Sequence, residues 1–201
     1  MAYTKQVLSI KPLYVRGPIS SEVEYTARQV RLLNEMLFSE GVVGDNDYLV
    51  SVSAGLTLSV AAGMAFVAGS MIADQGLYMQ ESDAAVLIAV GAHHATLPRI
   101  DRVILRVLDA QHDTSGLYEG RIEIVPGTAT AGATLVNLDG ANDLTVLDED
   151  SLNLHLLANA LIPATAGAVT LGDVRAQATI GSGTAASSGG GGGSLLTSLF
   201  F

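Results

Sequence analysis

The sequence predicts a mainly β protein: a compact β-sandwich or barrel-like domain, preceded by one α-helix and flanked by an extended N-terminal arm and a flexible C-terminal tail. Apolar and polar side chains alternate over 101–109 and again over 117–125, which is the period of half-buried strands. Between 49 and 90, short apolar runs are separated by glycine, alanine and aspartate turns. Such closely spaced strands and turns are typical of a sandwich or barrel.

The two alternating runs are joined by a polar loop and predict a long hairpin. In the first run, the odd-numbered apolar residues are expected to face the core, whereas Arg102 and Arg106 are expected to face outward. Like charges directly opposite each other destabilise a strand pair by up to ~1 kcal/mol. We therefore expect Arg106 to lie opposite Glu119, and Arg102 to lie opposite Glu123.

A helix is predicted over 21–40, where apolar residues recur at helical spacing. Ser21 and Glu24 form a capping box, and Gly41 stands where a glycine often ends a helix. Apolar residues occupy more than one side, so the helix is expected to lie between two bodies: helices of neighbouring copies, or parts of its own domain. The residues assigned to an oligomer interface are Val23, Ala27, Val30, Leu33 and Leu37.

Both ends of the chain are apolar and predict docking segments. Pro12 and the Gly-Pro step at 17–18 exclude a helix in the arm, which is expected to pair with its own sheet or with another subunit. A glycine-rich tether leads to an apolar C-terminal peptide, interpreted as a hook for a groove in another protein; the alternative is a segment without a role. The residues assigned to partner docking are Leu8, Ile10, Leu13, Leu195, Leu196, Leu199, Phe200 and Phe201.

The predicted organisation has five segments. They are a docking arm at 1–19, an oligomerisation helix at 20–41, a β-sandwich domain at 42–178, a Gly/Ser linker at 179–194 and a docking peptide at 195–201.

Composition and charge limit the partners. Hydrophobic residues make up 49% of the 201 residues and charged residues 15%, which suggests that partner chains cover part of the surface. The net charge of −10 argues against a nucleic-acid partner. Residues 1–31 hold five basic and two acidic residues, a net of +3, and the remainder holds five and eighteen, a net of −13. A basic N-terminal segment on an otherwise acidic chain could bind an acidic partner or pack against a neighbouring copy.

The sequence predicts no membrane span, and synthesis in the cytosol is expected. No apolar run approaches the about 18 residues that a span needs, and the N-terminus lacks an apolar signal region.

No catalytic residue, metal site or cofactor is expected. The acidic turn at 44–47 lacks the glutamate of a calcium loop, because Leu56 occupies that place. The adjacent His93 and His94 would point to opposite sides of a strand, with no third ligand near in sequence. A hydrolase would need a cleft that gathers His112 or His155 with carboxylates.

Three segments together resemble a domain of tail-tip and baseplate proteins of long-tailed bacteriophages. Residues 50–69 resemble its opening strand pair, and the Pro-Arg-Ile-Asp-Arg run at 98–102 resembles its central strand. Residues 156–163, followed by 169–175, resemble its closing strand and final turn. The resemblance covers about residues 20–178.

This resemblance implies a minor tail protein, a structural virion component that is often trimeric and attaches fibres or receptor-binding parts to the tail. Some such proteins continue into long fibre domains, whereas this sequence runs into the glycine tether, which favours an adaptor. We therefore expect a non-enzymatic, homotrimeric adaptor at the tail tip that binds other phage tail proteins. The alternative is a receptor- or glycan-binding tail-tip protein, which a shallow pocket lined by aromatics such as Tyr78 and Tyr118 would favour.

Overall fold

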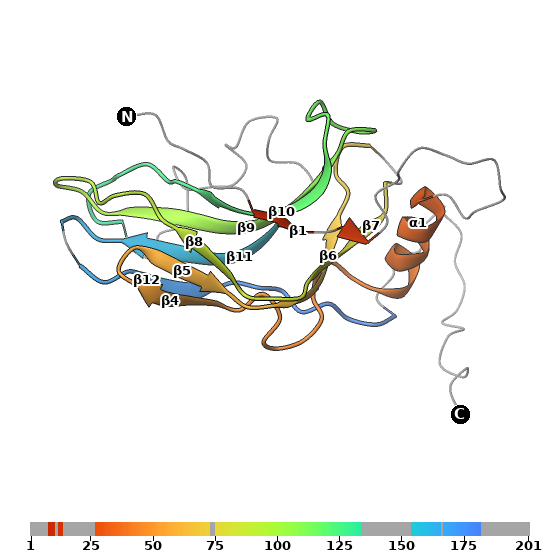
Figure 1. Ribbon diagram of the computed structural model, residues 1–201, viewed down its shortest axis with the longest axis horizontal. Helices are drawn as coiled ribbons and strands as arrows, with labels where there is room; N and C mark the ends of the chain where they lie inside the picture. Colours follow the sequence, from red (N-terminus) through yellow and green to blue (C-terminus); the bar gives the residue numbers. More distant parts are fainter. Residues whose placement is uncertain are drawn as a thin grey trace, which may run out of the picture.

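The computed structural model describes residues 8–10, 12–13, 27–72, 75–133, 154–165 and 167–181, and for 8–10 and 12–13 it describes the backbone alone. These residues form three antiparallel sheets and one helix, so the predicted mainly β, sandwich-like fold is confirmed (Figure 1). Outside the described residues lie Ser21, Val23 and Glu24, together with the predicted docking peptide 195–201.

The largest sheet has five strands and is centred on the run that predicted it. Its strand order is β1-β10-β9-β11-β12. The bounds are Leu8–Ile10 for β1, Tyr118–Val125 for β10, Arg99–Asp109 for β9, Leu154–Ile162 for β11 and Thr170–Asp173 for β12. β9 lies between β10 and β11, so its backbone is paired on both sides.

Two smaller sheets complete the fold. The four-stranded sheet has the order β2-β7-β6-β3, with β2 at Pro12–Leu13, β7 at Leu77–Ser82, β6 at Gly63–Ala68 and β3 at Gly41–Val42. The three-stranded sheet has the order β4-β5-β8, with β4 at Val50–Ala54, β5 at Thr57–Val60 and β8 at Val86–Ala89. Between β6 and β7, the Gly69 N–H donates to the Gly76 carbonyl.

One hydrophobic core lies among the three sheets. It includes Val103, Leu105, Val107, Ile122 and Ile124 from the large sheet, Leu58, Val60 and Ile88 from the three-stranded sheet, and Ala65 and Val67 from the four-stranded sheet. Alternate residues of β5, β6, β9 and β10 point into this core, and for β9 the sequence pattern predicted which ones. A slip of one residue would turn these side chains away from the core, so the pattern specifies the register strongly.

The hairpin register differs from the predicted one. Arg106 lies opposite Arg121, not Glu119. The like charges are offset by neighbours: Arg106 Nε lies 3.2 Å from Glu123 Oε2 on the diagonal, and Arg121 forms an ion pair with Glu119 two residues along its own strand. Diagonal and same-strand contacts therefore decide this register, whereas the prediction weighed only directly opposed pairs.

The second face of β9 is also buried. Arg102 lies opposite Val125, not Glu123, and both Arg102 and Arg106 are buried together with Ile104 between them. The prediction that the two arginines face outward is wrong. Alternation predicted which residues share a face, but it could not show that both faces of the strand are covered.

The helix α1 covers Ala27–Leu37 and ends before the predicted boundary. Phe38 leaves the helix and forms a β-bridge with Ile180. Gly41 does not end the helix; it begins β3 with a φ of +144°. A Cβ on Gly41 would lie 2.5 Å from the backbone nitrogen of Ala178, so the close approach of another strand-like segment requires glycine there.

Candidate interaction surface

The side of α1 that faces its own domain makes polar contacts to it. The helix packs against β7 at one end of the molecule (Figure 1). Arg31 Nε donates a hydrogen bond to the Gln75 carbonyl at 2.8 Å, and Asn34 Nδ2 donates to the Leu77 carbonyl at 3.2 Å. The helix is therefore held on the domain by directional contacts to backbone groups, which fix its rotation about its own axis.

Arg31 belongs to a buried polar network. Its guanidinium lies 3.6 Å from Asp109 Oδ2 and 4.7 Å from the centroid of the Tyr78 ring. The Tyr78 hydroxyl donates to Asp109 Oδ2 at 2.7 Å, and Gln75 Nε2 donates to that hydroxyl at 2.6 Å. Burial, followed by the hydrogen bond to Asp109, raises the pKa of Tyr78 well above its ordinary value. Tyr78 therefore stays a protonated donor, and the network links α1, β7 and β9.

The backbone of the turn before β7 also contacts the backbone of the helix. Gly76 has a φ of +80°, and a Cβ there would lie 2.6 Å from the backbone carbonyl carbon of Arg31. Glycine at this position lets the turn before β7 touch the helix backbone. The position of α1 is thus set by a backbone approach as well as by side chains.

The outward side of α1 is apolar. Leu33 is 52% exposed, Met36 72% and Leu37 46%, and the neighbouring Ile180 is 85% exposed. Ile180 reaches the helix end because it pairs with Phe38, and the Gly181 N–H donates to the Leu37 carbonyl. We call these four residues, Leu33, Met36, Leu37 and Ile180, the α1 patch. A surface helix normally places its apolar residues on the core, whereas Leu33, Met36 and Leu37 of this helix are exposed.

The predicted oligomer-interface residues divide between the two sides. Leu33 and Leu37 lie in the α1 patch, whereas Ala27 and Val30 are half-buried. Ile180 was not predicted, because it lies in the segment assigned to the linker. The sequence carries no signal that the side of the helix with Arg31 faces the domain.

The predicted partner-docking residues of the arm lie in edge strands of this chain. Leu8 and Ile10 are in β1, which pairs with β10, and Leu13 is in β2, which pairs with β7. Their backbones thus extend two sheets, one of the two arrangements expected for the arm. The C-terminal docking residues Leu195, Leu196, Leu199, Phe200 and Phe201 lie outside the described part of the chain.

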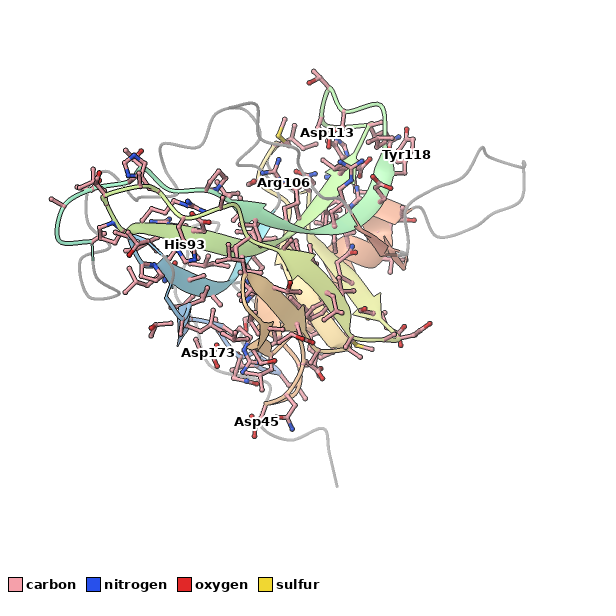
Figure 2. All side chains as sticks on the ribbon, turned by 60° about the vertical axis from the view of Figure 1, so that its left-hand side comes forward. Asp45, His93, Arg106, Asp113, Tyr118 and Asp173 are labelled. Atoms are coloured by element: carbon pink, nitrogen blue, oxygen red, sulfur yellow. The ribbon has the colours of Figure 1, made fainter. Side chains whose placement is uncertain are left out.

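The histidines lie in separate surroundings. His93 Nδ1 is 2.9 Å from the Pro163 carbonyl oxygen, His112 Nε2 is 3.3 Å from an Arg31 nitrogen, and His155 Nδ1 is 3.1 Å from Glu40 Oε1. Among the residues that the structure describes, no three histidine or acidic side chains are grouped as metal ligands. Asp113 lies on the loop between β9 and β10, and Figure 2 shows His93 well apart from it.

The acidic turn at 44–47 has a structural role. Asp47 Oδ2 accepts hydrogen bonds from the backbone N–H groups of Gly44 at 3.0 Å and Met64 at 3.1 Å. Nearby, the Arg175 side chain holds the pKa of the Asp173 carboxyl below its ordinary value. Asp45 and Asp173 both lie at the end of the molecule away from Asp113 (Figure 2). These carboxylates are thus explained by turn and ion-pair contacts.

The aromatic pocket expected of a glycan-binding protein is not formed by the predicted pair. Tyr78 is buried in the network around Asp109, whereas Tyr118 is exposed at the start of β10. A ring that stacks on a sugar must be accessible, and Tyr78 is not. Tyr78 and Tyr118 therefore do not form the pocket that would have favoured a glycan-binding protein.

Comparisons of the chain with protein-family models, with curated proteins and with solved structures found no match. The resemblance to phage tail proteins therefore remains a prediction that depends on the three sequence segments. In the described part of the chain, α1 is too short and too polar to cross a membrane.

Proposed function

We propose that this chain is a non-enzymatic structural protein of a phage tail tip: an oligomeric adaptor that joins the tail to fibre or receptor-binding components. The sequence resemblance supports the assignment to the virion and to other tail proteins as partners. The observation that carries the oligomeric part is the α1 patch, an apolar surface on a helix whose polar side is already occupied.

The patch is unfavourable in an isolated copy. Burying a leucine, isoleucine or methionine side chain gains about 1.5–3 kcal/mol, and the four residues of the patch leave much of this gain unrealised. The helix cannot turn its apolar side inward without breaking the contacts of Arg31 and Asn34. Contact between α1 helices of neighbouring copies would bury the patch without that loss. A trimer fits this arrangement, since each helix then touches two others around one axis.

The direct test changes the patch without touching the polar network. In a double variant, Leu33→Glu with Met36→Glu, charges replace two exposed apolar side chains. Losing two buried contacts is expected to weaken association roughly 100-fold or more. Light scattering over a range of protein concentrations measures the oligomer, and circular dichroism checks that the fold is retained.

A matched control is available on another surface. Leu87 on β8 is 58% exposed and lies outside the patch, so Leu87→Glu is expected to leave the oligomer unchanged. A wild-type chain that stays monomeric at every concentration would contradict the oligomeric adaptor. Incorporation of the double variant into phage particles at the wild-type level would contradict the role in tail assembly.

A second candidate is a receptor- or glycan-binding tail-tip protein. The observation in its favour is the exposed pair Leu117 and Tyr118 next to the loop between β9 and β10 (Figure 2). Saccharide binding on a glycan array that is lost in Tyr118→Ala would favour this function over the adaptor.

A further inference from the structure

The N-terminal arm closes the edges of two different sheets. In β1, Leu8 lies opposite Ile122 and Ser9 opposite Arg121, at the edge of the five-stranded sheet. Four residues after Ser9, Leu13 of β2 lies opposite Met79, at the edge of the four-stranded sheet. Figure 1 shows β1 beside β10 and close to β7. The arm is thus a strap of five paired residues that spans both sheets.

Without the arm, two edges would be open. β10 has eight residues and β7 has six, and each would present unpaired backbone groups along one side. Such an edge recognises an extended backbone, which any chain in the right register can supply. The arm of a second copy has the same sequence and would make the same contacts, so exchange loses no pairing.

The connection between the arm and α1 is longer than its end points require. Leu13 lies opposite Met79, and Asn34 of α1 bonds to the Leu77 carbonyl, so both elements lie on the same short stretch of β7. Thirteen residues, 14–26, join β2 to α1. Most connections have about 4–6 residues. Thirteen residues can span up to roughly 45 Å.

Charge favours an acidic acceptor for the arm. Lys5, Lys11 and Arg16 are the charged side chains of residues 1–21, and no acidic residue occurs among them. Residues 32–201 carry the net charge of −13. Residues 32–201 of a neighbouring copy therefore attract the arm as strongly as those of its own copy. Contact at the α1 patch would hold that neighbour at high effective concentration.

We infer that copies joined at the α1 patch exchange their N-terminal arms, so that each arm completes the β10 and β7 edges of a neighbour. This inference rests on the proposed oligomer. It names the partner of the two edges as β1 and β2 of a second copy of this chain.

Cysteine cross-linking tests the exchange, because the chain contains no cysteine. Directly opposed residues of an antiparallel pair lie close enough for a disulfide after small adjustments. Ser9→Cys and Arg121→Cys are made in separate proteins, which are refolded together, oxidised and separated on a non-reducing denaturing gel. Exchange predicts a two-chain product whose 9–121 disulfide is identified by mass spectrometry. Each single variant alone and a mixture of Ser9→Cys with Ser51→Cys on the exposed β4 are controls for random cross-links.

The double variant, Ser9→Cys with Arg121→Cys, separates the outcomes. Exchange predicts covalently linked chains, whereas a disulfide within one chain and no mixed product would overturn it. A double variant that forms neither an interchain nor an intrachain disulfide would also overturn it, because the register of β1 would then be wrong. Light scattering on the same samples distinguishes the two levels: an oligomer with one-chain disulfides leaves the proposed function standing, and a monomer contradicts both.

Discussion

Among single residues, Arg31 decides which side of α1 faces solvent. Charged residues are rarely fully buried unless they are paired, so a sequence reading places an arginine outside. Here Asp109, Tyr78 and the Gln75 carbonyl supply the partners that make burial possible. These partners lie more than forty positions along the chain, which is why the sequence could not indicate the orientation of the helix.

Replacing Arg31 by alanine is expected to lower the free energy of unfolding by about 3–5 kcal/mol, because the change leaves the Asp109 carboxylate buried without its cation. Urea denaturation at a protein concentration where the chain is monomeric measures this change. α1 is expected to lose its protection against hydrogen exchange in the same variant.

The control for this substitution is Arg28→Ala on the same helix. Arg28 is exposed, and surface substitutions of this kind usually change stability by less than about 1 kcal/mol. Equal losses in the two variants would show that the buried network does not hold the helix.

Among elements, the strands were predicted better than their ends and pairings. Strong alternation predicted β9 and β10, and the resemblance of residues 156–163 to a closing strand predicted most of β11. The helix end was missed because Phe38 pairs with Ile180, a contact made across most of the chain. The register of the hairpin was missed because the diagonal neighbour of Arg106, not the residue opposite, supplies the counter-charge.

The contact between the turn before β7 and α1 predicts the effect of Gly76→Ala. The substitution adds a Cβ that would lie 2.6 Å from the Arg31 carbonyl carbon, at a φ of +80°. We expect a loss of about 2 kcal/mol or more in the free energy of unfolding, from backbone strain and from displacement of the helix. Urea denaturation measures the loss, and faster hydrogen exchange in α1 is expected to accompany it.

Gly116→Ala is the matched comparison. Gly116 has a φ of +67°, but nothing lies within 4 Å of the added Cβ. This variant reports backbone strain alone, expected at about 1 kcal/mol. If it loses as much stability as Gly76→Ala, the approach of the turn to the helix is not what requires glycine at position 76.

In the whole molecule, apolar residues exceed what one domain buries. The core accounts for the alternating strands, and among the described residues four of the eleven exposed large apolar side chains belong to the α1 patch. The sequence predicted this excess from the apolar composition, and it predicted Leu33 and Leu37 at the surface involved. It could not predict Ile180 in the same patch, because that residue is brought there by the bridge to Phe38.

If assembly buries this excess, thermal stability depends on protein concentration. Unfolding of an oligomer releases separate chains, so dilution favours the unfolded state. For a chain of 201 residues, we expect Tm to rise by roughly 1–3 °C for each tenfold increase in concentration. Calorimetry at several concentrations measures this slope. The Leu33→Glu, Met36→Glu variant is expected to show no slope, and Leu87→Glu the wild-type slope; a wild-type Tm independent of concentration would show that the folded chain does not need its copies.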